Sequence, residues 1–157
     1  MTETTFTFNS GNSTLDTRST LDGLGRGHIV QQKQSPTSSN YDSVETDYDS
    51  YGRPWRSTMP YVGTAGQGFP AGTPVTTATY DALSRAKLAT DAGGGTVNYT
   101  YTDNNVFIEL GPLAAGDSNT KRRQYKYDAL GRLISVCELA TNVSNGTCQA
   151  TPLSRSP

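Results

Sequence analysis

The chain has 157 residues, of which 33% are hydrophobic, and a formal net charge of −1. Leu, Ile, Val and Phe together number only 26, against 23 Thr and 15 Ser, which excludes a thick aliphatic core and favours thin, half-buried β-sheet. With Lys121–Arg123 as the main basic cluster, nucleic-acid binding is not expected, and no apolar run reaches the roughly 18 residues of a membrane span.

Composition and the position of a sequence repeat divide the chain into three expected segments. Residues 1–18 are a polar lead-in that could hold a strand, and they show no apolar region of a signal peptide. Residues 19–136 hold about five repeats, one of them degenerate. Residues 137–157 are interpreted as a partial further repeat with a loop-like, truncated tail, so that the chain is expected to be a fragment or a truncated copy.

A hexapeptide of the pattern Tyr-Asp-x-x-Gly-Arg recurs along the middle segment. Its defining positions are Leu21, Asp22, Gly25 and Arg26, then Tyr48, Asp49, Gly52 and Arg53, then Tyr80, Asp81 and Arg85, and finally Tyr127, Asp128, Gly131 and Arg132. A degraded copy contains Tyr101 and Asp103. The steps between the aromatic positions are 27, 32, 21 and 26 residues, which a basic unit of 21 residues with loop insertions explains.

Each hexapeptide predicts a tight turn between two strands. Asp and Gly three residues apart favour a type I turn, and alternating segments such as 97–101 and 106–110 flank the motif. The pattern therefore predicts a β-hairpin for each unit. In each hairpin we expect the Arg to lie near its Asp and to stack on Tyr rings of adjacent units. Connecting loops are predicted at 34–40, 63–74 and 111–116, with a tight turn at 91–95 joining two strands of the third unit. The chain is predicted to be all-β.

The hexapeptide and its spacing resemble the bacterial RHS/YD-repeat proteins (rearrangement hotspot, tyrosine–aspartate repeats), from about Leu21 to Val136. The resemblance implies consecutive antiparallel hairpins in a strip of spiral sheet that forms a hollow shell. In bacterial members of the family the shell encloses a toxin or effector domain, and teneurin-like relatives act at the cell surface.

The implied function is therefore a non-enzymatic structural segment of a secreted or cell-surface bacterial scaffold. Its implied partners are further repeats and an enclosed toxin domain. The sequence departs from the pattern at Leu21, Ser84 and Thr102, where looser turns are expected, and it lacks the Asp-Pro boundary motif that precedes a toxin. The alternative is an adhesive module that binds glycans through its nine Tyr residues.

Other candidate sites are weaker. The only histidine, His28, is expected to be exposed or packed on the sheet, and the repeated Asp residues are explained by their turns, so neither catalytic residues nor a bound cofactor or metal is expected. Cys137 and Cys148 bracket an Asn-Gly turn signal, and a disulfide and two unrelated thiols both remain open for them.

Overall fold

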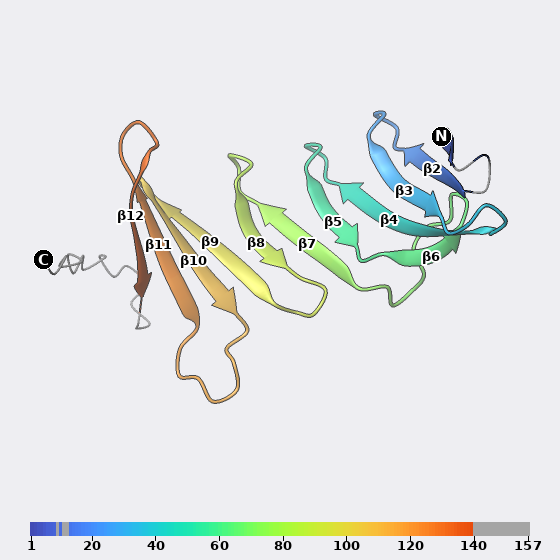
Figure 1. The fold of residues 1–157 in the computed structure, drawn as a ribbon. Helices are drawn as coiled ribbons and strands as arrows, with labels where there is room; N and C mark the ends of the chain where they lie inside the picture. Colours follow the sequence, from blue (N-terminus) through green and yellow to red (C-terminus); the bar gives the residue numbers. More distant parts are fainter. Residues whose placement is uncertain (9, 11–12, 140–157) are drawn as a thin grey trace, which may run out of the picture. The chain divides into compact units, whose positions relative to one another are not determined.

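The computed structural model describes residues 1–8, 10 and 13–139, and this part of the chain is all-β (Figure 1). Its 12 antiparallel strands hydrogen-bond in one open sheet, in which the strands follow the order of the chain except that β6 pairs with β4. The predicted run of consecutive hairpins is confirmed. The strands are β1 (Thr2–Phe8), β2 (Ser13–Leu21), β3 (Gly27–Lys33), β4 (Asn40–Tyr48), β5 (Pro54–Thr58), β6 (Tyr61–Thr64), β7 (Val75–Tyr80), β8 (Ala86–Thr90), β9 (Thr96–Thr102), β10 (Asn105–Gly111), β11 (Lys121–Tyr127) and β12 (Leu133–Leu139).

The predicted segment boundaries fall inside strands. The boundary after residue 18 cuts β2, and the boundary after residue 136 cuts β12. The lead-in contains all of β1, which pairs with β2 in register from Thr2↔Ser19 to Phe8↔Ser13. The turn motif marks only the centre of each repeat, because the strands extend several residues to either side of the turn.

Met1–Ala78 form one compact unit. Alternate residues of β3 and β4 face its interior, as the period of two requires, so Ile29 and Tyr41 are buried while Val30 points outward. The interior is strongly polar: Gln31 and Ser43 are each only 1% exposed, and the Gln31 side-chain amide donates to Ser43 Oγ at 2.9 Å. Because the chain has few aliphatic residues, hydrogen-bonded polar side chains fill the interior in which a thicker apolar core would otherwise lie.

The segment 63–74, predicted as a flexible connection, is instead anchored. It begins as the end of β6, and its backbone then donates to buried side chains, from Gly66 N to Gln31 Oε1 at 2.6 Å and from Phe69 N to Glu45 Oε2 at 3.1 Å. The Tyr61 hydroxyl also donates to the carbonyl of Gln67 at 2.9 Å. The Gly and Pro content of this segment indicates turns, but the buried acceptors that fix those turns, Gln31 and Glu45, lie on strands far away in the sequence.

Thr79–Pro157 form the second compact unit, described through Leu139. Its strands are mostly half-buried, and Gln124 on β11, at 6% exposure, donates from its side chain to Asn105 Oδ1 at 3.1 Å. Glu109 on β10 accepts from Thr120 Oγ1 at 2.5 Å and from Arg122 Nη2 at 2.8 Å, and these donors, Thr120 first, lower the pKa of Glu109. Polar pairs between strands again take much of the place of apolar packing.

Candidate functional site

Four turns in the described part of the chain share one set of contacts, and we call each an Asp–Arg turn. In the first, Asp22 Oδ1 accepts from the backbone N–H groups of Leu24 and Arg26, both at 2.9 Å. The main chain closes the turn between Asp22 N and Arg26 O at 2.8 Å and between Gly25 N and Asp22 O at 3.1 Å. The same bonds recur at the turns 49–53, 81–85 and 128–132.

The arginine side chain completes each Asp–Arg turn. Its Nε atom lies 2.7 Å from the second carboxylate oxygen of the aspartate in all four copies. One oxygen of the aspartate is therefore taken by the backbone and the other by the guanidinium. Because this geometry occupies both oxygens, these carboxylates act as structural caps.

The glycine position of the Asp–Arg turn has a positive φ, from 75° at Gly131 to 82° at Gly52, as in a type I turn followed by a bulge. Ser84 takes the same conformation with φ 62°. The looser turn expected at Ser84 is not found, because the bonds from Ser84 N to Asp81 O at 3.0 Å and from Asp81 N to Arg85 O at 2.9 Å are kept. Serine at this position therefore keeps the hydrogen bonds of the turn, but its backbone is strained by the positive φ.

The donors around each aspartate favour its charged form. The backbone N–H of the following arginine is the largest cause of a lowered pKa at Asp22, Asp81 and Asp128, with the guanidinium adding to it. At Asp49, desolvation raises the pKa, but the donors of Arg53 and Tyr51 outweigh it and the pKa is again lowered. The same electrostatic arrangement is thus repeated along the chain.

At the first and third Asp–Arg turns, a tyrosine on the next hairpin contacts the turn, because the second strand of one hairpin pairs with the first strand of the next. At the second turn, the Arg53 guanidinium lies 4.9 Å from the ring of Tyr51 in the same turn. The guanidinium of Arg26 lies 4.1 Å from the centre of the Tyr48 ring, and the Tyr48 hydroxyl donates to the carbonyl of Gly27 at 3.0 Å. Arg85 and Tyr101 repeat the stacking at 4.0 Å, and the Tyr101 hydroxyl donates to Ala86 at 2.9 Å. We call this pair of interactions the inter-hairpin tyrosine contact.

The degraded repeat keeps its tyrosine but has another turn. Thr102 and Asn105 pair directly, which leaves a two-residue loop, and Asp103 has a φ of 50° at its first position. This turn is tight, where a looser one was expected. A fifth aspartate cap occurs at Asp91, whose Oδ1 accepts from Gly93 N at 2.8 Å and Gly95 N at 2.7 Å. It was expected to join two strands of the third unit, but it joins β8 to β9 and so links the third hairpin to the fourth.

The tip of every Asp–Arg turn carries an exposed apolar or aromatic residue. These residues are Leu24 at 79%, Tyr51 at 82%, Leu83 at 73% and Leu130 at 77% exposure. Each stands two positions after the aspartate, where the turn projects its side chain outward. Sequence reasoning did not single out this position, although its recurrence is visible in the motif itself.

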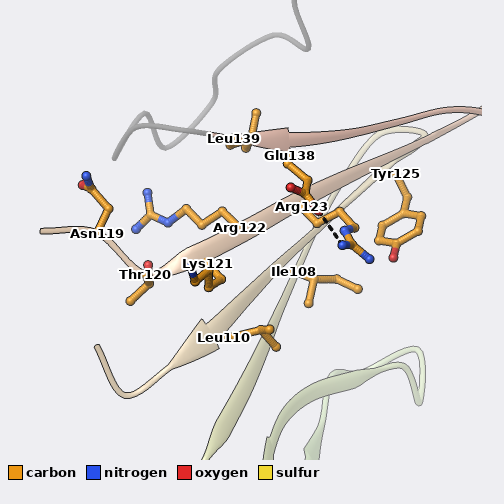
Figure 2. Close-up of a pocket in the computed structure, with 10 residues that line it drawn as sticks. All are labelled: Ile108, Leu110, Asn119, Thr120, Lys121, Arg122, Arg123, Tyr125, Glu138 and Leu139. Carbon is orange, nitrogen blue, oxygen red and sulfur yellow. Dashed lines mark hydrogen bonds and ion pairs between the residues drawn. The ribbon is translucent and has the colours of Figure 1, made fainter. Parts of the chain in front are cut away.

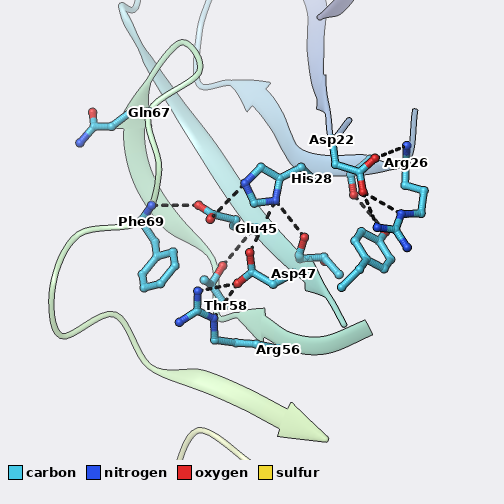
Figure 3. Close-up of polar contacts among 12 residues, drawn as sticks. Asp22, Arg26, His28, Glu45, Asp47, Arg56, Thr58, Gln67 and Phe69 are labelled. Carbon is cyan, nitrogen blue, oxygen red and sulfur yellow. Dashed lines mark hydrogen bonds and ion pairs between the residues drawn. The ribbon is translucent and has the colours of Figure 1, made fainter. Parts of the chain in front are cut away.

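The structure places His28 beside two acidic residues of β4, a grouping we call the His28 cluster (Figure 3). His28 Nε2 lies 3.5 Å from Glu45 Oε1, and His28 Nδ1 lies 3.7 Å from Asp47 Oδ1. Sequence reasoning missed this cluster. Its signal is the spacing of Glu45 and Asp47, which share one face of a strand, but the pairing of Ile29 with Glu45 that brings His28 alongside is not visible in the sequence.

The basic stretch of β11 lines a hollow of about 600 Å³ in the second unit (Figure 2). Arg123 Nη2 lies 2.6 Å from Glu138 Oε1, and Arg122 is paired with Glu109. The two arginines of the main basic cluster are therefore neutralised by carboxylates on neighbouring strands. Cys137 lies on β12 and is disulfide-bonded. Cys148, for which a disulfide with Cys137 and two unrelated thiols were both left open, lies outside the described residues.

Comparison with protein-family models gives no match, and comparison with curated proteins gives none either. Within the described residues, no helix is long and apolar enough to cross a bilayer.

Proposed function

We propose that this chain is a non-enzymatic structural segment of an RHS/YD-repeat protein, and that its hairpins form part of a β-shell around a toxin or effector domain carried elsewhere in the protein. The proposal includes secretion or display at a bacterial cell surface. The observation that carries it is the Asp–Arg turn, repeated four times with the same hydrogen bonds. The degraded repeat at Tyr101 adds a further hairpin between the third and fourth of these turns.

The inter-hairpin tyrosine contact supports a role in scaffolding. Tyr48 and Tyr101 each bind the start of the preceding strand, so that every such contact adds one hairpin to its neighbour. A ring stacked under a guanidinium, with its hydroxyl already donated, has little left to offer a sugar. The repeated tyrosines at these positions therefore favour the scaffold over the glycan-binding alternative.

The occupied carboxylates argue against hydrolytic chemistry at the repeats. A paired-carboxylate mechanism needs one group free to give a proton and another free to attack or activate water. Asp22 accepts from two backbone N–H groups and from the Arg26 guanidinium, and its three counterparts do the same. Aspartate caps of this kind are consistent with a repeat that has a structural role.

The exposed turn tips support contact with another surface. Four hairpins each present a residue that is more than 70% exposed and apolar or aromatic, at Leu24, Tyr51, Leu83 and Leu130. Single exposed apolar residues are common on soluble proteins, but the same position in each repeat is a regular feature. Exposed tips that recur in this way are suited to contact with an enclosed domain.

The test is protection of a neighbouring domain from protease. The chain is expressed together with the coding sequence that flanks it in its genome, and cleavage is followed by mass spectrometry. We expect further repeats in the flanking sequence and a non-repeat domain that resists cleavage. In Tyr48→Ala/Tyr101→Ala that protection should be lost, whereas Leu113→Ala, which changes an exposed loop outside the Asp–Arg turns, should keep it.

Two outcomes would contradict the proposal. One is flanking sequence without further repeats. The other is a neighbouring domain cleaved equally fast in the wild type and in the double variant. Binding of the isolated chain to a glycan array, abolished by Tyr51→Ala, would favour the adhesive module instead.

A further inference from the structure

We propose that the His28 cluster binds a divalent first-row transition metal ion, with His28 Nε2, Glu45 Oε1 and Asp47 Oδ1 as its protein ligands. The three side chains offer ligand atoms that all lie within 4.8 Å of one another. They come from β3 and β4 of the first unit, so the backbone pairing of two strands holds them in place. This inference is independent of the proposed scaffold function.

The hydrogen bond of the imidazole ring fixes which nitrogen is available. His28 Nδ1 lies 3.0 Å from the carbonyl oxygen of Thr46. A carbonyl can only accept a hydrogen bond, so Nδ1 carries the proton and, in the neutral ring, Nε2 presents a lone pair. That lone pair faces the carboxylate of Glu45, and two acceptors placed so close need a cation or a proton between them.

The distance between the two acceptors suits a metal ion. His28 Nε2 and Glu45 Oε1 are 3.5 Å apart, beyond the usual length of a direct hydrogen bond. Two ligands that each lie about 2.1 Å from one tetrahedral ion are separated by about 3.4 Å. Asp47 Oδ1 lies on the Nδ1 side of the ring, 3.7 Å from that nitrogen, so its side chain would have to turn toward Nε2 to complete the ligand set.

Each ligand is also held by a second group, as is common around protein metal sites (Figure 3). The carbonyl of Thr46 accepts a hydrogen bond from Nδ1 of His28 and so orients the ring. The buried Glu45 uses Oε2 to accept from Phe69 N at 3.1 Å, and Asp47 uses Oδ2 to accept from Arg56 Nε at 2.6 Å. The remaining oxygen of each carboxylate is the one that faces His28.

The ligand set indicates the kind of metal. One imidazole nitrogen with two carboxylate oxygens suits Zn²⁺ or its neighbours in the first transition row, whereas Ca²⁺ and Mg²⁺ prefer oxygen alone. Three protein ligands leave one tetrahedral position for water. The His28 side chain is 32% exposed, which gives an ion a path to the site, and binding would tie β3 and β4 to the loop that contains Phe69.

The test is titration of the full chain with Zn²⁺, made without a histidine tag. Because His28 is the only histidine, long-range ¹H–¹⁵N spectra of its imidazole report on the site directly in the wild type. We expect one equivalent of Zn²⁺ to shift the Nε2 resonance while Nδ1 keeps its proton. Calorimetry should give one site, with affinity reduced at least about tenfold in His28→Gln, Glu45→Gln and Asp47→Asn.

The matched control is Asp42→Asn, on the same strand. Asp42 is exposed and accepts from Gln34 Nε2 at 2.8 Å, so the variant changes the charge of β4 away from the cluster and should bind Zn²⁺ like the wild type. The proposal is overturned if the Nε2 resonance of the folded wild type does not respond to Zn²⁺. A doubly protonated ring that ignores the metal would identify an ion pair with the two carboxylates instead.

Discussion

The hydroxyl of Tyr48 donates a hydrogen bond of 3.0 Å to the backbone carbonyl of Gly27. The two residues are 21 positions apart and belong to successive hairpins, joined where the start of β3 meets the end of β4. The bond fixes the tyrosine ring under Arg26, at 4.1 Å. One side chain thus links the turn of one repeat to the strand of the next.

Removal of the Tyr48 hydroxyl should weaken the first unit. Tyr48→Phe keeps the ring under Arg26 but leaves the Gly27 carbonyl without its donor, and we expect a loss of about 1 kcal/mol in the free energy of unfolding. Tyr51→Phe is the matched control, because Tyr51 is 82% exposed and its change should stay within about 0.5 kcal/mol. Urea unfolding monitors both variants. Equal effects would contradict a role for the inter-hairpin tyrosine contact.

The serine in the third Asp–Arg turn should be a site of stabilising substitution. Ser84 has a φ of 62°, a conformation that costs L-residues about 1–2 kcal/mol and that glycine adopts without strain. After the greater chain entropy of glycine is subtracted, Ser84→Gly should raise the free energy of unfolding by about 0.5–1 kcal/mol.

The reverse change serves as the control. At Gly25, with a φ of 81°, an added Cβ would meet no atom within 4 Å, so Gly25→Ser tests the backbone alone and should cost about 1 kcal/mol. Thermal unfolding measures both variants. A destabilised Ser84→Gly protein would show that the contacts of the serine side chain outweigh its backbone strain.

The Asp–Arg turns should make stability depend on pH in the acid range. The pKa values of Asp22, Asp81 and Asp128 are lowered in the folded chain, first by the backbone N–H of the following arginine, so the unfolded chain binds more protons there. Their stabilisation is complete above the unfolded pKa of about 3.9 and is lost as the pH falls through the lower folded values.

Urea midpoints measured at successive pH values test this expectation. The midpoint should drop below about pH 4, and the drop should be shallower in Asp22→Asn/Asp81→Asn/Asp128→Asn. Asp117→Asn, in an exposed loop, is the control and should follow the wild type. A triple variant with an unchanged acid profile would show that other carboxylates govern the transition.

The turns were predictable because their chemistry is local. Asp22 and Arg26 lie four residues apart, and the type of turn requires an acceptor at the first position and a residue of positive φ at the fourth. The tyrosine partners of Arg26 and Arg85 were predictable only as tyrosines of a neighbouring unit. Stacking on a tyrosine of an adjacent unit followed from the repeat, whereas the choice of Tyr48 for Arg26 depends on the register of β3 against β4.

The buried polar contacts could not be predicted, since they join residues far apart in sequence. Gly66 donates to Gln31 across 35 positions, and Phe69 donates to Glu45 across 24. A loop rich in glycine and proline has the same composition whether its backbone is solvated or bound. His28 likewise meets Glu45 and Asp47 through strand pairing alone.

The first strand of the sheet should promote self-association. β1 is exposed along its whole length and stands at one end of the strand order, with Phe6 and Phe8 each 54% exposed. Edge strands with apolar side chains pair with other chains unless charges prevent it. Sedimentation velocity should show oligomers that decrease in Phe6→Lys but not in Leu113→Lys, which adds the same charge to an exposed loop. A monomeric wild type would rule out this association.

The polar interior of the first unit should be as critical as an apolar core. Gln31 is 1% exposed, donates to Ser43 Oγ and to the Thr64 carbonyl, and accepts from Gly66 N. Gln31→Ala leaves the Gly66 N–H without its acceptor and removes one partner each from Ser43 Oγ and the Thr64 carbonyl, and we expect a loss of about 3 kcal/mol in the free energy of unfolding. The neighbouring Gln32 faces solvent, so Gln32→Ala should change it by less than about 0.5 kcal/mol.

Hydrogen exchange locates the effect. In Gln31→Ala, the amides of Gly66 and Phe69 should exchange faster, because the loop loses its bond to Gln31, while its bonds to Glu45 and Tyr61 remain. If both glutamine variants unfold at the same urea concentration, the buried network contributes no more than an exposed side chain. The first unit would then depend on Ile29, Tyr41 and Tyr61 for its stability.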